Sequence, residues 1–285
     1  MPTDPEGLVL VDKPQGITSH DAVAMVRRAL GTKKAGHAGT LDPMATGLLL
    51  IGVGRATRLL RFLAELPKTY EGSMRFGVET DTLDAEGAVV REAEVRATQV
   101  AVATAMDALA GDSLQTPPAY SAVKVGGTKL YDAARRGAPL EVPARPIHVE
   151  SFELLDFETP EAAFRVVCGG GTYVRVLAAD VGRALGCGAH LTRLRRTSIG
   201  LFDVTGATSP QDPGAPLPVE QVVDHLPRVT LEPEEAIAAE NGRVLGPAGK
   251  GGPYAVFAPR GRLIGVYEDD GAKARPMVIL PPPPS

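Results

Sequence analysis

One carboxylate in this chain has neighbours that suit chemistry. Asp42 lies in the stretch GHAGTLDPMATG, where glycines, small residues and one proline surround it. Such residues let the backbone come close to a ligand, and a carboxylate placed there can act as a nucleophile or a general base. Asp before Pro is also a common turn dipeptide. The local spacing therefore leaves a catalytic and a purely structural interpretation open.

Basic residues on both sides of this loop favour the catalytic interpretation. Four precede it and two follow it, namely Arg27, Arg28, Lys33, Lys34, Arg55 and Arg58. A carboxylate near several arginines stays ionised and can be held in place by one of them. A single acid with arginines around it and no metal fits an anionic polymer as the substrate.

The motifs of several common enzyme classes are missing from the sequence. There is no GxxxxGK[ST], no GxSxG, no HExxH, and no GxGxxG at a strand-to-helix turn. The five histidines are scattered, and Cys168 and Cys187 lack the spacing of metal ligands. We therefore expect no metal site and two reduced cysteines.

The hydropathy pattern predicts neither a membrane segment nor a leader. The longest apolar run, residues 48–53, is far shorter than the roughly 20 residues that a membrane helix needs. The first residues, MPTDPEG, are acidic and lack the apolar stretch of a secretion signal. We therefore expect a cytoplasmic protein without a membrane partner.

Composition and charge predict a folded protein with a basic face. The 285 residues are 44% hydrophobic and 22% charged, which fits one large domain or a large and a small one. The net charge of −4 weakly disfavours a nucleic-acid partner. However, residues 183–196 contain four arginines and no acid, while acids gather at 79–112 and 232–240. A basic face is enough to contact phosphates.

The elements that must position Asp42 are predominantly strands. Apolar runs and alternation predict strands at 8–14, 47–53, 68–78, 87–95, 146–157, 162–168 and 190–204. Helical periodicity predicts helices at 18–30, 55–66, 98–109 and 172–186. Several strands are connected as hairpins. This indicates an α+β fold with a mixed, mainly antiparallel sheet and flanking helices, not a regular βαβ series.

Two segments lie outside this pattern. Residues 115–137 combine a Pro-Pro break, a Gly-Gly turn and a basic-ended helix, and we interpret them as an excursion from the sheet. After a Pro- and Gly-rich linker around 206–218 and a short helix, a small β-rich module begins at about 228. It contains a hairpin across Pro259–Gly261 and a last strand, RPMVIL.

Five sequence blocks in order resemble one known family closely. They are DKPQGITSH (12–20), GHAGTLDPMATGLLLIGVGRATRL (36–59), KTYEGSMRFGVETDTLDAEG (68–87), TPPAYSAVKVGGTKLYDAARRG (116–137) and GTYVRVLAADVGRALGCGAHLTRLRR (171–196). The chain resembles the bacterial tRNA pseudouridine-55 synthases, the TruB family of pseudouridine synthases.

The resemblance implies a domain plan. Residues 1–225 would form a catalytic domain of the pseudouridine synthase fold, with an RNA-clamping insertion at about 115–140. Residues 228–280 resemble a PUA-like RNA-binding domain, and 281–285 would be a disordered tail.

The resemblance also implies roles for seven residues. Asp42 falls on the catalytic aspartate, and Tyr70 on a tyrosine that stacks on the target base and is a candidate for moving the C5 proton. Tyr173 and Arg175 fall beside the aspartate, where Arg175 would pair with it, and Leu194 falls on a residue that lines the base pocket.

The last two of the seven are basic residues near the loop. His37 falls on a histidine that fits against the T loop. Arg58 stands where a relative has Lys.

The activity implied is isomerisation of uridine-55 in the tRNA T loop after base flipping. The expected partner is the T stem-loop of tRNA, bound by a monomer. No oxidation occurs, so no cofactor is expected. Attack of Asp42 on C1′ and attack on C6 both remain open. One alternative is a non-catalytic RNA-binding protein. A weaker one is a metal-free hydrolase, for which a second acid or a His placed to activate water is lacking.

Overall fold

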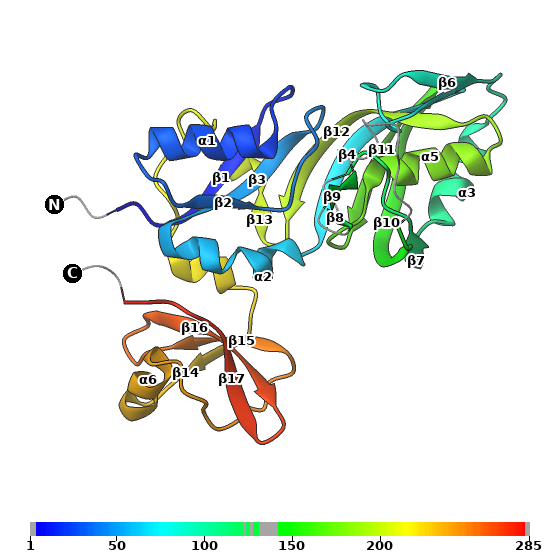
Figure 1. Ribbon diagram of the computed structural model, residues 1–285. Coiled ribbons are helices and arrows are strands. Elements are labelled where there is room, and N and C mark those ends of the chain that lie inside the picture. The colour runs from blue at the N-terminus through cyan, green and yellow to red at the C-terminus, as the bar shows by residue number, and fades with distance from the viewer. Residues whose placement is uncertain (1–3, 122–123, 126–127, 131–141, 283–285) are drawn as a thin grey trace. The chain divides into compact units, whose positions relative to one another are not determined.

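The apolar run predicted as a doubly buried strand forms β3 (Thr46–Val53), whose residues after Thr46 are all buried. The structure is a computed structural model, and it describes residues 4–121, 124–125, 128–130 and 142–282 (Figure 1). In it, the chain divides into two units. The first comprises 1–42, 47–64 and 200–285, and the second comprises 43–46 and 65–199.

Two strands of the first unit pair with β3. The predicted strand β1 (Gly7–Lys13) lies antiparallel to it along seven residues. The second, β2 (Ala35–Ala38), is also antiparallel and falls in a segment that we predicted as loop. Its sequence, AGHA, is short and consists mostly of small residues, so it shows no alternation of polar and apolar side chains. Pairing with β3 is therefore what makes it a strand.

The first helix packs on one face of these strands and begins as its sequence predicts. Thr18 caps α1 (Ser19–Ala29), because its hydroxyl accepts from the Asp21 N–H while the Asp21 carboxylate accepts from the Thr18 N–H. The apolar side of α1 meets strand side chains in a cluster of buried residues: Val9, Val11, Ala22, Val23, Val26, Ala35, Leu49, Ile51 and Val53.

The helix predicted at 55–66 is divided in two. It begins as a 3₁₀ turn, η1 (Gly54–Arg58), and only α2 (Leu60–Ala64) is α-helical. Leu60 packs against β3 at Gly52, where an added Cβ would lie 2.9 Å from the Leu60 side chain. Figure 1 shows α1 and α2 on opposite sides of the first-unit strands.

The second unit contains a run of five antiparallel strands. In order they are β12 (Ala189–Ile199), β4 (Lys68–Phe76), β11 (Glu161–Cys168), β10 (Arg145–Glu158) and β7 (Gly111–Gln115). The mainly antiparallel sheet is therefore confirmed.

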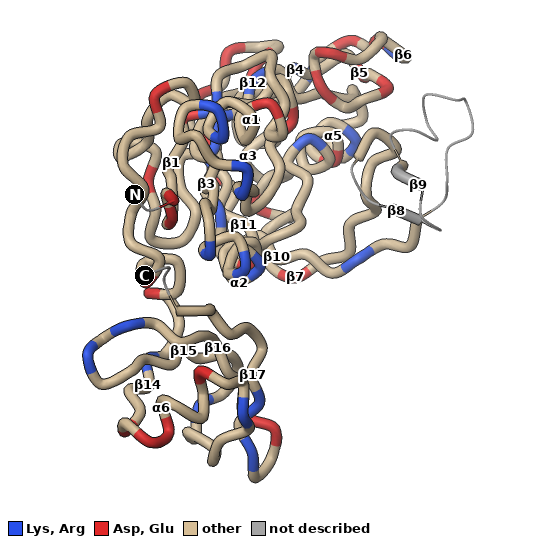
Figure 2. Tube along the Cα trace, turned by 60° about the vertical axis from the view of Figure 1, so that its left-hand side comes forward, with Lys and Arg blue, Asp and Glu red and all other residues tan. Residues whose placement is uncertain are grey.

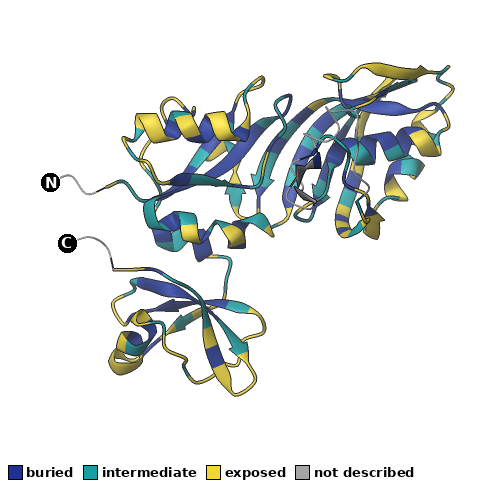
Figure 3. Ribbon diagram, in the orientation of Figure 1, coloured by how far each residue is buried: buried dark blue, intermediate teal, exposed yellow. Residues whose placement is uncertain are grey.

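Two helices pack on this second-unit sheet, as Figure 1 shows. They are α3 (Gln99–Asp107), which Thr98 caps, and α5 (Val174–Ala184). Both expose their outward faces and bury their inward ones, which Figure 3 shows as alternating colours. The predicted helix at 172–186 is thus confirmed, with ends two residues shorter on each side.

Short ribbons project from the second-unit sheet. The strand predicted at 68–78 ends at Phe76, because Gly77 has a φ of 84° and turns the chain into β5 (Val78–Thr80), which pairs with β6 (Val89–Glu92). Figure 2 shows the predicted acidic residues gathered on this ribbon. In the excursion, β8 (Lys124–Val125) pairs with β9 (Thr128–Lys129). Its predicted helix falls mostly at 131–141, outside the described residues.

The strand predicted at 190–204 ends as β12 at Ile199, and the chain re-enters the first unit through Gly200, whose φ is 52°. Three short elements follow: β13 (Phe202–Asp203), η2 (Val204–Gly206) and η3 (Val219–Val223). The short helix predicted after the linker is thus a 3₁₀ helix.

The predicted β-rich module forms a four-stranded sheet. Its order is β14 (Arg228–Thr230), β15 (Pro253–Phe257), β16 (Leu263–Asp270) and β17 (Lys273–Ile279). The hairpin between β15 and β16 and the last strand are confirmed. One helix, α6 (Pro233–Glu240), was not predicted. The tail residues 283–285 lie outside the described residues.

Candidate active site

The loop that carries Asp42 is held by the start of α1. The buried Ser19 hydroxyl accepts a hydrogen bond from the Leu41 N–H at 2.9 Å and donates one to the Leu41 carbonyl at 3.1 Å. Leu41 immediately precedes Asp42, which is half-buried. The backbone at Asp42 is therefore fixed by a residue of the first sequence block.

The buried ammonium group of Lys13 supports the turn that precedes α1. Lys13 is the last residue of β1, near the end of the strand predicted at 8–14. However, Lys13 is fully buried, and its ammonium group donates to the carbonyls of Pro14 and Ile17 at 3.0 and 2.8 Å. It thereby fixes the turn that leads into Thr18 and α1. The Lys-Pro pair before a helix cap was the available signal.

The two basic candidates of the first unit lie on different elements. His37 is on β2, half-buried, with its ring edge-to-face against His20 at 5.3 Å between centroids. Arg58 ends η1 and is exposed. Arg61, the basic residue of α2, follows Arg58 three positions later.

Tyr70 and Leu194 lie on one face of the second-unit sheet. Tyr70 and Gly72 are two residues apart on β4 and therefore share one face, and Gly72 is directly opposite Leu194 on β12. Both Tyr70 and Leu194 are 7% exposed. An added Cβ at Gly72 would lie 2.5 Å from the Arg193 carbonyl oxygen, so this approach of the two strands requires glycine. The structure therefore makes the two predicted pocket residues diagonal neighbours.

Two buried cations accompany Tyr70 on this face. Arg196, directly opposite Tyr70, is 1% exposed, with its guanidinium carbon 6.0 Å from the Tyr70 ring centroid. Lys68 is also buried, and burial, followed by the charge of Arg196, lowers the pKa of its ammonium group to about 8. Arg196 is one of the four arginines that we expected on a basic face, and its burial corrects that expectation.

Tyr173 and Arg175 meet at the start of α5. Tyr173 is the N-cap residue, and Arg175 lies in the first turn with its guanidinium carbon 5.8 Å from the Tyr173 ring centroid. Arg175 is 5% exposed. Its guanidinium pairs with the Asp84 carboxylate at 3.4 Å and donates to the carbonyls of Thr82 and Tyr120.

Asp84 is a site residue that sequence reasoning missed. Its carboxylate accepts hydrogen bonds from the Thr82 hydroxyl at 2.6 Å and from the Glu86 N–H at 3.1 Å. It is 3% exposed and lies in the stretch 79–112, where acids gather along the sequence. A buried carboxylate in that position orients the arginine. The pairing of Arg175 with Asp42 stays a prediction.

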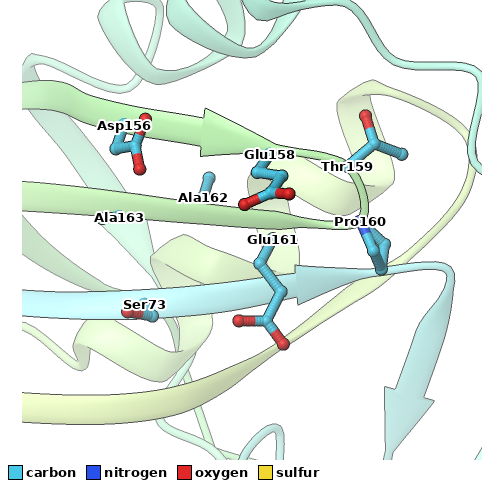
Figure 4. A pocket seen from close by; sticks show the side chains of 8 residues that line it. All are labelled: Ser73, Asp156, Glu158, Thr159, Pro160, Glu161, Ala162 and Ala163. Atoms are coloured by element: carbon cyan, nitrogen blue, oxygen red, sulfur yellow. The ribbon is translucent and has the colours of Figure 1, made fainter.

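A cavity of about 400 Å³ lies elsewhere in the second unit, at the end of the β10–β11 hairpin. Figure 4 shows that Asp156, Glu158 and Glu161 line it together with Ser73. Three carboxylates would repel phosphates, and none of the seven predicted site residues lines this cavity. It is therefore no candidate for the RNA site.

The described residues contain neither a cluster of metal ligands nor a membrane-spanning helix. No group of three or more His, Cys, Asp or Glu side chains is placed to hold a metal ion. Within the same ranges, no helix has the length and apolarity needed to cross a bilayer.

Three family models match successive parts of the chain. The model described as TruB family pseudouridylate synthase (N terminal domain) matches residues 27–174. The tRNA pseudouridylate synthase B C-terminal domain matches 175–212, and tRNA Pseudouridine synthase II, C terminal, matches 226–281.

Similar proteins from several bacteria are named tRNA pseudouridine synthase B. The one from Aromatoleum aromaticum is 46% identical over 93% of this chain and 89% of its own length. The one from Mycolicibacterium paratuberculosis is 44% identical over 98% of both chains, and the one from Thermobifida fusca is 44% identical over 96% and 98%.

Solved structures match the fold. A chain of the archaeal box H/ACA sRNP Nop10–Cbf5 complex matches with a TM-score of 0.76 at 24% identity, covering 98% of this chain and 88% of that one. A chain of a Cbf5–Nop10–Gar1 complex matches with a TM-score of 0.74 at 26% identity, over 97% and 85%. Matches along nearly the whole length, in sequence and in fold, lead to one conclusion: the chain belongs to the TruB family of pseudouridine synthases.

Proposed function

We propose that this protein converts uridine-55 in the T loop of tRNA to pseudouridine, with Asp42 as the nucleophile. The observation that carries the proposal is the identity of 42–46% to proteins named tRNA pseudouridine synthase B, over at least 93% of this chain. The family acts on tRNA as an isomerase. The proposal adds the T loop as the target and the roles of the individual residues.

The chemistry needs little beyond one nucleophile and a closed slot. The bond from C1′ to N1 breaks, the uracil rotates, and a bond from C1′ to C5 forms. N1 gains a proton and C5 loses one, so nothing is oxidised or reduced. Asp42 attacks either C1′ or C6 and holds the separated fragment. The backbone at this carboxylate is fixed through Leu41 by Ser19, which supports its use as a positioned nucleophile.

The target base must leave the folded loop to reach Asp42, since a stacked uridine is inaccessible. Tyr70 and Leu194, diagonal neighbours on one sheet face, offer an aromatic ring and an apolar side chain for the flipped uracil. The Arg175 guanidinium would hold the Asp42 carboxylate ionised, and Tyr173 would flank it. Asp84 supports this role because it orients Arg175.

The remaining expectations concern the tRNA partner. The segment 115–140 would clamp the T stem-loop, His37 would fit against the T loop, and Arg58 would contact phosphate. Within the domain plan of 1–225 and 228–280, the second part would be a PUA-like RNA-binding domain, and its four-stranded sheet with one helix is compatible with this. We propose a monomer that acts in the cytoplasm.

The proposal is tested by tritium release from unmodified tRNA labelled at uracil C5. We expect wild-type protein to release tritium from one T-loop uridine, and Asp42→Asn to release none while its tRNA affinity stays within a few-fold. Asp212→Asn, at an exposed acid in the linker, should behave as wild type. Absence of release by the wild type would disprove the enzymatic function, and activity in Asp42→Asn would disprove the choice of nucleophile.

A further inference from the structure

The backbone of Tyr173 is bound by a side chain as if by a neighbouring strand. Tyr173 has an extended conformation, with φ −96° and ψ 106°. In an antiparallel pair, an extended residue exchanges both its N–H and its C=O with one partner. Here the partner is the Gln115 amide, whose Oε1 accepts from the Tyr173 N–H at 2.8 Å and whose Nε2 donates to the Tyr173 carbonyl at 3.2 Å.

This arrangement makes Gln115 more than a surface amide. It is 4% exposed at the end of β7, and both ends of its amide group are bonded to a single residue. The Tyr173 side chain makes no capping hydrogen bond to α5. Removing the Gln115 amide would leave a backbone N–H at the helix start without the bond that now satisfies it, which is costly when the group is buried.

The ring of Tyr173 is held from a second residue. The Arg145 guanidinium carbon lies 5.0 Å from the ring centroid, and Arg145 Nη2 donates to the Gly171 carbonyl at 2.6 Å. Arg145 begins β10 and is directly opposite Gln115 on β7. Two cross-strand neighbours therefore hold Tyr173. Gln115 binds the Tyr173 backbone, and Arg145 contacts the Tyr173 ring.

The segment that follows Gln115 also contacts Arg175. The Arg175 Nη2 donates to the carbonyl of Tyr120, five residues after Gln115 in the chain. Tyr173 and Arg175 are two residues apart at the start of α5, so a shift of the Tyr173 backbone shifts the base of the Arg175 side chain as well.

We propose that Gln115 and Arg145 are positioning residues, which hold Tyr173, and through it Arg175, in the geometry that the uridine reaction requires. The inference rests on the proposed function, in which Tyr173 and Arg175 lie beside the nucleophile. Neither Gln115 nor Arg145 needs to contact the uridine. Their effect should therefore appear in the rate of the bound complex, because small misplacements of reacting groups cost up to about 100-fold in rate.

The kinetic test uses Gln115→Met and Arg145→Met in the full chain. Methionine keeps the length of the Gln115 side chain approximately and replaces the aliphatic stem of Arg145, and it makes neither the amide bonds nor the stacking contact. We expect kcat for tritium release to fall about 10- to 100-fold, with the Kd for tRNA within about threefold, at a temperature well below the melting point of each variant. The matched control is Asp112→Asn. Asp112 is also on β7, and its exposed carboxylate pairs with His148, so this variant should keep wild-type kcat.

A double-mutant cycle separates positioning from general destabilisation. If Arg145 acts through the ring, adding Arg145→Met to Tyr173→Leu should lower kcat by less than about twofold more. Full additivity of the two losses would overturn the role of Arg145. A loss in tRNA affinity with unchanged kcat in either single variant would overturn the positioning role of that residue.

A readout independent of activity keeps the inference distinct from the proposed function. Hydrogen exchange of the Tyr173 amide should be at least about tenfold faster in Gln115→Met than in wild type or Asp112→Asn, since its bond to Gln115 is lost. If the wild type releases no tritium, the proposed function fails and the exchange rate alone decides whether Gln115 holds Tyr173. Unchanged exchange, or wild-type kcat in both Met variants of an active enzyme, would overturn the inference.

Discussion

Tyr70 and Tyr173 are positioned by different means, although both rings have a guanidinium group within about 6 Å. Tyr70 lies within β4, which pairs with β12 on one side and β11 on the other. Tyr173 lies at the end of a loop, where the Gln115 amide and the Arg145 guanidinium hold it.

This difference determines how sensitive the position of each tyrosine is to single substitutions nearby. Backbone ladders on both sides fix Tyr70, so single side-chain changes nearby should alter its charge environment more than its place. The start of α5 depends on individual buried side chains, so single changes there should be costly. Three substitutions test this contrast, and they are given in order of decreasing expected effect on stability.

Asp84→Ala should have the largest effect on stability. It leaves the Arg175 guanidinium buried without the carboxylate that lies 3.4 Å away, with side chains only 6% and 5% exposed. Loss of one partner of such a buried pair costs about 3–5 kcal/mol in free energy of unfolding, measurable by urea denaturation. The control is Glu71→Ala, next to Tyr70, whose pair with Arg165 is nearly half exposed and should contribute about 1 kcal/mol or less. Equal losses at the two sites would remove the contrast.

Lys68→Met removes the buried ammonium group two residues before Tyr70 on the same face of β4. Burial lowers the pKa of Lys68 in the folded protein from 10.5 to about 8, so between these values the unfolded chain binds more protons. The wild-type free energy of unfolding should therefore rise, relative to that of Lys68→Met, by about 3 kcal/mol as the pH increases from 8 to 10.5. Denaturant titrations at several pH values measure this difference. Parallel pH profiles of the two proteins would show that Lys68 is not desolvated.

Gly72→Ala tests the close approach of β4 and β12. The added methyl would lie 2.5 Å from the Arg193 carbonyl oxygen and 2.7 Å from Phe164, so the strands must separate, at a cost of about 2 kcal/mol. Gly169→Ala, in the loop before Tyr173, is the matched control, because its nearest neighbour would be 3.7 Å away. Thermal melting should show a clear loss for Gly72→Ala alone. Similar melting temperatures for the two variants would argue against a tight strand contact at Gly72.

The parts of the fold that sequence reasoning predicted well carry strong local patterns. The continuous apolar run of β3 and the alternation of β4 each have an unambiguous physical signature. The four-residue strand β2 and the helix α6 lack one, since β2 depends on its partner β3, and α6 is short and weakly amphipathic. The division of η1 from α2 follows from packing of Leu60 against Gly52, a contact that no local pattern records.

The site was predictable only in part, for a similar reason. Family resemblance indicated Asp42 and Arg175, but Asp84 meets Arg175 across 91 positions of sequence. Arg196 had a local signal, because the alternation that places Leu194 inward also places Arg196 inward. We interpreted it as a surface charge, since arginine is seldom fully buried.

The contact between Ser19 and Leu41 has a consequence for protein engineering. A designer who wished to move the Asp42 loop into another scaffold could not transplant residues 36–47 by themselves. The hydroxyl that fixes Leu41 comes from the first turn of α1, and the strand that follows the loop is β3. The smallest transferable cassette would therefore run from Thr18 to Val53, with its own helix cap included.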